Sequence, residues 1–172
     1  MNKQSEHGFS SEQYWIDRYK SGGNSGKGSY GLIAAYKGEV VNSIIQEFDI
    51  GSVVEFGSGD GNQLSYYEIS DYTGLDVSGE MIDSCRARYA DKKKWRFIKR
   101  SEVPEYTGRH DMAMSIDVIF HLIEDDVYEK YMTELFDCAT RFVLIYSTDK
   151  DGTNKVAHFR SRKYSRACGQ SS

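Results

Sequence analysis

Short apolar runs alternate with stretches of helical periodicity along most of the chain. The runs have the length and the flanking turn residues that are typical of buried strands. We expect strands at 52–56, 72–75, 95–98, 111–116 and 141–147. We expect helices at 11–19, 32–48, from about 63, 79–89 and 124–138. Strands that alternate with helices predict an α/β fold with a doubly wound, mainly parallel Rossmann-like sheet.

The helix expected at 32–48 carries apolar residues at spacings of three or four, namely Ile33, Tyr36, Val40, Ile44 and Phe48. This period predicts an amphipathic helix, whose apolar stripe ordinarily faces the core.

The sequence predicts a single domain between two polar ends of the chain. We expect a flexible tail at 1–10, a domain at 11–165 and a disordered tail at 166–172. The chain has 172 residues, which suffices for one domain with a real core. Its formal charge of −4 does not predict attraction to nucleic acid or to an anionic membrane.

The three cysteines show no metal-binding spacing. Cys85, Cys138 and Cys168 are odd in number and form no C-x-x-C pair, so we expect reduced thiols and no metal site. The chain has neither an apolar signal core nor a membrane-length run. We therefore expect a soluble, cytoplasmic protein.

The strand at 52–56 leads into a loop with glycine at every second position, Glu55-x-Gly57-x-Gly59-x-Gly61. Glycine lets the backbone approach a ligand closely. Asp76 follows the next strand, and ligands of such sheets bind beyond the carboxyl ends of the strands. A carboxylate there can accept hydrogen bonds from both hydroxyls of a ribose.

The loop departs from the dinucleotide fingerprint G-x-G-x-x-G. Asn62 stands where the third glycine belongs, and the acid Glu55 would repel a pyrophosphate. A nicotinamide-dependent oxidoreductase is therefore disfavoured.

The E-x-G-x-G-x-G loop together with Asp76 closely resembles motifs I and II of the class I S-adenosylmethionine-dependent methyltransferases. The resemblance implies S-adenosyl-L-methionine as cofactor. It places the methionine end on Glu55 and on the backbone of Gly57, Ser58 and Gly59, with the ribose on Asp76. Val77 would lie beside the adenine. Ser101 and Glu102, at the end of the third strand, are the candidates for contacting the adenine amine.

The segment Ser115-Ile116-Asp117-Val118-Ile119-Phe120-His121-Leu122 resembles motif IV of the small-molecule branch of this family. The resemblance puts Asp117 next to the methionine of the cofactor. His121 has two interpretations. It is either a general base for a hydroxyl acceptor or a structural histidine between the strand end and the next helix.

The glycine-serine segment 21–31 is either a flexible linker or a lid. Its sequence resembles a subgroup of methyltransferases associated with bacterial surface-polysaccharide gene clusters. The resemblance implies that the loop closes over the cofactor, with Tyr30 and Asn24 as contacts. It also suggests a small-molecule acceptor, a hydroxyl of a sugar or glycan precursor.

The family fold continues after its fifth strand with a helix and an antiparallel strand pair. Residues 148–172 are too few for these elements, although 155–164 could begin the helix. We therefore expect an open sheet edge, covered by a homodimer contact or a partner. The basic residues of this tail are either solvated or face a phosphorylated acceptor. The alternative function is an inactive or partner-dependent module that binds S-adenosylmethionine.

Overall fold

The computed structural model describes residues 9–152 and 156–165. Most of the two predicted tails, and with them Cys168, lie outside the described residues.

Five parallel strands form one sheet in the order β3-β2-β1-β4-β5. They are β1 (Ser52–Phe56), β2 (Asp71–Asp76), β3 (Trp95–Lys99), β4 (His110–Ile116) and β5 (Ala139–Tyr146). The chain winds outward from β1 to β3 and then returns to β4 on the other side of β1. The predicted doubly wound parallel sheet is confirmed, and the strand order reverses between β1 and β4, where such sheets bind ligands.

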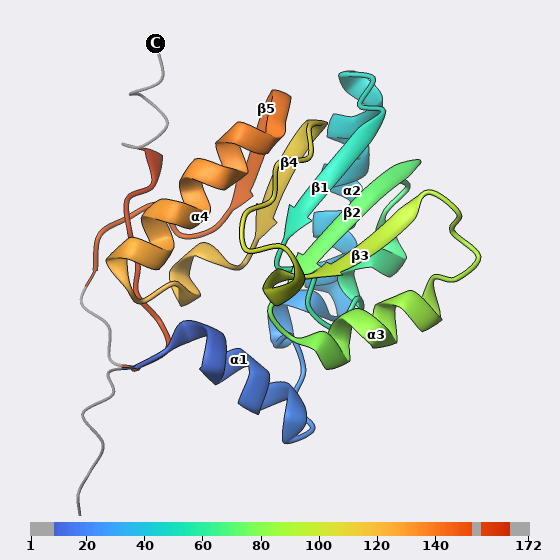
Figure 1. Ribbon diagram of the computed structural model, residues 1–172. Helices are drawn as coiled ribbons and strands as arrows, with labels where there is room; N and C mark the ends of the chain where they lie inside the picture. Colours follow the sequence, from blue (N-terminus) through green and yellow to red (C-terminus); the bar gives the residue numbers. More distant parts are fainter. Residues whose placement is uncertain (1–8, 153–155, 166–172) are drawn as a thin grey trace, which may run out of the picture.

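Helices cover both faces of the sheet (Figure 1). α2 (Gly31–Glu47) and α3 (Gly79–Arg88) pack on one face, and α4 (Asp125–Cys138) packs on the other. α1 (Ser11–Lys20) lies across the carboxyl ends of the strands. Short 3₁₀ turns complete the fold: η1 (Lys27–Ser29), η2 (Gln63–Tyr66), η3 (Arg100–Glu102) and η4 (Ile119–His121).

Serine side chains set the starts of two helices. The Ser10 Oγ accepts from the amide of Gln13 at 3.2 Å, and the Ser78 Oγ accepts from the amide of Met81 at 3.4 Å. Each bond satisfies an amide that the helix itself leaves unpaired. The Ser78 cap is the one predicted from the sequence.

Side chains alternate between two apolar layers along the buried strands. Val53 and Met112 pack toward α2 and α3, whereas Val54 and Ala113 pack toward α4. Because both faces of the sheet are covered, four of the five residues of β1 are buried, as in parallel strands generally.

The helix expected at 32–48 forms as α2, but most of its apolar stripe does not face the core; Ile44 alone of the five residues packs against it. The buried residues of α2 include Ala34, Val41 and Ile45, while Ile33 and Tyr36 are 50% and 61% exposed. Phe48, at the end of this stripe, contacts Phe142 of β5 with ring centroids 5.0 Å apart. The stripe therefore lies on the β5 side of the helix, and among the described residues no further strand covers it.

Two other expected helices are not formed. The segment after Gln63 makes only the single turn η2, because β2 begins at Asp71, five residues after that turn ends. Residues 156–164 contain no helix and instead fold back on the η4 segment, where the amide of Arg160 donates to the Phe120 carbonyl at 2.8 Å.

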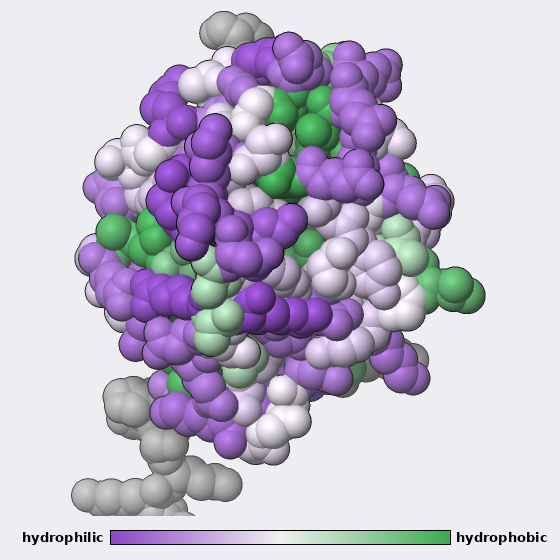
Figure 2. Space-filling view, turned by 90° about the vertical axis from the view of Figure 1, so that its right-hand side faces the viewer, coloured by the Kyte–Doolittle hydropathy of each residue, from purple (hydrophilic) through white to green (hydrophobic). Residues whose placement is uncertain are grey.

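The surface on the β3 and α3 side is mainly polar, with a few small apolar patches (Figure 2). No helix in the described part of the chain is long and apolar enough to cross a membrane.

Candidate functional site

A cavity of about 510 Å³ opens at the carboxyl ends of β1, β2 and β4. Its walls come from the glycine loop, α1, the 21–31 loop, η3 and α4. Eight of the predicted site residues line it: Glu55, Gly57, Ser58, Gly59, Asp76, Val77, Ser101 and Asp117. His121 lines it as well. Three other predicted contacts, Asn24, Tyr30 and Glu102, are not part of the lining.

The glycine loop needs residues without a side chain. Gly57, Gly59 and Gly61 have φ values of 89°, 57° and 73°, which disfavour other L-residues. A Cβ on Gly57 would lie 2.5 Å from a Val118 methyl carbon, and one on Gly59 would lie 2.4 Å from the Ser25 Oγ. The loop is therefore a tight cradle of backbone at the end of β1.

Asp76 ties this cradle to the end of β2. Its Oδ2 accepts from the Gly59 amide at 2.8 Å, and its Oδ1 accepts from the Ser78 amide at 2.9 Å. Burial raises the pKa of Asp76, and the amides that donate to it act in the opposite direction. Since each carboxylate oxygen can accept two hydrogen bonds, Asp76 retains capacity for a ligand in the cavity.

Glu55 is fully buried, and its carboxylate is held by a neighbouring strand. Tyr72 of β2 donates to its Oε2 at 2.5 Å. Burial raises the pKa of Glu55 to about 7, although the Tyr72 hydrogen bond and the charge of Lys37 lower it. Glu55 is nevertheless one of the residues that line the cavity.

Two uncharged side chains in the cavity wall have a buried oxygen without a hydrogen-bond partner in the described part of the chain, the Ser58 Oγ and the Gln63 Oε1. The Gln63 amide nitrogen is held by the Ala34 carbonyl at 2.8 Å, which fixes the direction of the free oxygen. Buried polar atoms are nearly always paired, so these two indicate a polar ligand.

Asp117, the residue that follows β4, has a backbone conformation that is uncommon outside glycine, with φ of 58°. Its Oδ2 lies 2.7 Å from the Nζ of Lys37, a lysine of α2 whose side chain is only 2% exposed. Sequence reasoning missed Lys37. The available signal was its place at helical spacing between Ala34 and Val41, on the face that proved to be buried.

His121 is held in one orientation. Its Nδ1 lies 2.8 Å from the His158 carbonyl oxygen, and its ring contacts Trp15 edge-on with centroids 4.8 Å apart. A carbonyl oxygen only accepts, so Nδ1 carries the proton and Nε2 keeps its lone pair. Burial lowers the pKa of His121, which favours this neutral form.

The 21–31 loop is anchored to the glycine loop through Asp60. The amide of Ser25 and the hydroxyl of Tyr30 each donate to the Asp60 Oδ2 at 2.8 Å. Asn24 instead stabilises its own loop, where its Oδ1 accepts from the Gly26 amide at 3.0 Å. The structure thus gives Tyr30 and Asn24 roles in shaping the loop, and it is Ser25 and Ser29 that line the cavity.

The end of β3 also differs from expectation. Glu102 turns away from the cavity toward Arg86, with an O–N distance of 3.3 Å. Arg100 turns inward and pairs with the buried Glu134 of α4 at 2.8 Å. Ser101 and Arg100 are therefore the polar groups that this segment brings to the cavity.

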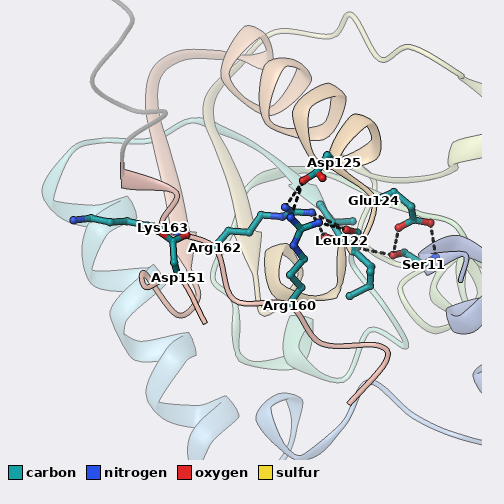
Figure 3. A network of polar contacts seen from close by, with 9 residues as sticks. Ser11, Leu122, Glu124, Asp125, Asp151, Arg160, Arg162 and Lys163 are labelled. Carbon is teal, nitrogen blue, oxygen red and sulfur yellow. Dashed lines mark hydrogen bonds and ion pairs between the residues drawn. The ribbon is translucent and has the colours of Figure 1, made fainter. Parts of the chain in front are cut away.

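A polar network fixes the segment that carries His121 (Figure 3). The Ser11 amide donates to the Glu124 carboxylate at 2.9 Å, and Arg162 contacts Asp125 at 2.6 Å. Arg160 reaches the same Asp125 at 3.0 Å. Two arginines of the basic tail are thus bound to the start of α4, which argues against a freely solvated run. Lys155 and Arg166 lie outside the described residues.

No group of three potential metal ligands occurs among residues 9–152 and 156–165. The two cysteines there, Cys85 and Cys138, are buried free thiols.

The sheet order and the cradle beside Asp76 define a Rossmann-like methyltransferase fold. A family model described as a methyltransferase domain matches residues 53–141, which is 89 of the 172 residues. The chain belongs to this family. The resemblance deduced from the glycine loop is confirmed at that level. No curated protein sequence is significantly similar to the chain.

Three solved structures illustrate the shared fold. Magnesium protoporphyrin IX methyltransferase from Synechocystis PCC 6803 with bound SAM is 14% identical, with a TM-score of 0.61 over 90% of this chain and 84% of that one. The methyltransferase domain of bacterial CtHen1-C is 21% identical, with a TM-score of 0.54 over 64% of each chain. A SAM-dependent methyltransferase from Thiobacillus denitrificans, in complex with S-adenosyl-L-homocysteine, is 14% identical, with a TM-score of 0.53 over 76% of this chain. The chain spans 64% of the CtHen1-C domain and 54% of the Thiobacillus protein.

Proposed function

We propose that the chain binds S-adenosyl-L-methionine in this cavity and transfers its methyl group to a small-molecule acceptor, a hydroxyl of a sugar or glycan precursor. The observation that carries the proposal is the backbone cradle of Gly57 and Gly59 against Asp76, at the point where the strand order reverses. Membership of the methyltransferase family supports the same proposal.

The residues present fit this cofactor. The unpartnered Ser58 Oγ and Gln63 Oε1 require polar groups, and the cofactor is rich in them. Asp76 would accept from the ribose hydroxyls, with Val77 and Ser101 toward the adenine. Glu55, Asp117 and the backbone of residues 57–59 would hold the methionine end. When bound, S-adenosylmethionine supplies a methyl group activated by a positively charged sulfur.

The protein's part in the reaction is orientation and proton removal. Holding two reactants in line can contribute several kcal/mol without a covalent catalyst. The unprotonated Nε2 of His121 supports its assignment as the general base that takes the proton of an acceptor hydroxyl. Trp15 adds an aromatic wall beside His121, which suits the flat face of a sugar ring.

The proposal includes a cellular compartment and a contact with a second chain. Buried free thiols at Cys85 and Cys138 support a reducing compartment such as the cytoplasm. The exposed stripe of α2 beside the edge strand β5 supports a homodimer contact or a partner at that edge.

Replacing Asp76 by alanine is expected to weaken S-adenosylhomocysteine binding by roughly 10- to 150-fold. This range corresponds to about 1.5–3 kcal/mol for hydrogen bonds to a charged group. Isothermal titration of the folded variant measures it, and Asp71→Ala, at the opposite end of β2, is the control. An Asp76 variant that is folded and binds with unchanged affinity would remove Asp76 from the ribose site.

A further inference from the structure

The ion pair between the buried Lys37 and the half-buried Asp117 joins α2 to the residue that follows β4. The Nζ–Oδ2 distance is 2.7 Å, and the lysine side chain is 2% exposed. Lysine is almost never fully buried unless it is paired. Its ammonium also lies 5.4 Å from the centre of the Tyr146 ring, on β5. The side chain therefore reaches inward to Asp117 and has no contact with the cavity itself.

Three elements fix the position of Asp117. Lys37 of α2 pairs with the Asp117 Oδ2. The backbone amide of Asp117 donates to the Tyr146 carbonyl of β5 at 2.9 Å. Gly28 of the 21–31 loop packs behind the carboxylate, where a Cβ would lie 2.7 Å from the Oδ2. A residue at φ of 58° persists only when its surroundings determine it in this way.

The other carboxylate oxygen is available to a ligand. Within the described residues the Asp117 Oδ1 has no hydrogen-bond partner, and Asp117 lines the cavity. An ionised oxygen accepts strongly from an ammonium group. Removing the Lys37 ammonium would leave the carboxylate free to rotate away from this direction.

We propose that Lys37 is a positioning residue, which holds Asp117 so that its free oxygen accepts from the ammonium group at the methionine end of the cofactor. This inference rests on the proposed function. It assigns Lys37 no contact with the cofactor. Lys37 acts through Asp117 and, by its charge, on the carboxylate of Glu55 at the same end of the cavity. The inference therefore predicts that Lys37 matters only for ligands that carry the amino-acid end.

Two ligands separate this role from a general structural one. S-Adenosylhomocysteine carries the amino-acid end, whereas 5′-methylthioadenosine lacks it. Lys37→Met should weaken S-adenosylhomocysteine binding by about 10- to 150-fold, the range for one hydrogen bond to a charged group, and change methylthioadenosine binding by less than about threefold. Isothermal titration with both ligands measures the two affinities.

Asp117→Asn should give the same selective loss, and adding Lys37→Met to it should cost less than about twofold more, because the two residues act as one unit. The double variant also removes both charges of the pair, which keeps the test available if Lys37→Met alone does not fold. Lys37→Arg should restore part of the affinity for S-adenosylhomocysteine. Lys20→Met, at the exposed end of α1, controls for the loss of one positive charge.

Equal weakening for both ligands would make Lys37 structural, and unchanged affinity for both would remove it from the site. Either result overturns the inference. If the unaltered chain binds neither ligand, the proposed function itself fails.

Discussion

Replacing Gly57 by valine is expected to lower the affinity for S-adenosylhomocysteine by more than about 100-fold. At φ of 89° a β-branched residue is strained, and its Cβ would lie 2.5 Å from a methyl carbon of Val118, which also lines the cavity. Backbone strain of about 1–3 kcal/mol combined with a displaced cavity wall accounts for an effect of this size. Isothermal titration of variants whose folding is verified by circular dichroism measures it.

Gly22→Val is the matched control for this substitution. Gly22 has a similar φ of 79°, and a Cβ added there meets nothing within 4 Å. The control therefore carries the same backbone strain without the clash, and it should lose stability while keeping its affinity. If Gly22→Val and folded Gly57→Val bind the ligand equally well, the cradle does not hold the cofactor.

Replacing His121 by glutamine is expected to lower the rate of methyl transfer by roughly 10²- to 10⁴-fold, the usual contribution of a positioned general base. Glutamine can keep a hydrogen bond to the His158 carbonyl but cannot take a proton. Single-turnover transfer from labelled S-adenosylmethionine, with an acceptor selected from a panel of sugar hydroxyl compounds, measures the rate. Affinity for S-adenosylhomocysteine should change by less than about threefold.

The pH profile of the same reaction gives a second test of His121. Protonation of Nε2 at low pH removes the base, so the rate should fall as the pH decreases. Burial lowers the pKa of His121 from 6.5, and the acid limb should therefore lie below pH 6.5. His110→Gln is the control, because His110 is buried at the start of β4, away from the cavity.

The competing interpretation of His121 has a distinct outcome. If His121 is purely structural, its substitution should lower both the melting temperature of the protein and its affinity for the cofactor. If neither the variant nor the unaltered chain methylates any acceptor while the cofactor still binds, the inactive binding module becomes the better description.

The strands and the cradle were predictable because their signals are local. A continuous apolar run marks a strand covered on both faces, and glycines at every second position mark a loop that needs positive φ. Asp76 was predictable because it ends the strand after this loop. The first strand, the glycine loop and Asp76 lie within 25 residues of one another and do not depend on distant contacts.

Features set by long-range contacts were not predictable. Periodicity identified an apolar stripe on α2 but not which side faces the sheet, and Tyr36 proved to be exposed. The burial of Lys37 depends on Asp117, which is 80 residues away. The position of Glu102 at the end of β3 suggested a contact with the adenine. Glu102 instead pairs with Arg86 of α3, and Arg100 lines the cavity.

The role of the 21–31 loop shows the same limit. Its composition left both a flexible linker and a lid open, and its resemblance to a family subgroup suggested Tyr30 and Asn24 as contacts. The contacts that place it involve Asp60, about 35 positions further along the chain. Which side chains of the loop enter the cavity follows from this anchor, and they are the serines.

Titration of the unaltered chain with S-adenosylhomocysteine and with NAD⁺ tests the central claim most directly. A cradle of Gly57 and Gly59 against Asp76, with Glu55 inside it, should bind S-adenosylhomocysteine with a stoichiometry of about one per chain and should not bind NAD⁺. Binding of NAD⁺ without binding of S-adenosylhomocysteine would contradict the account.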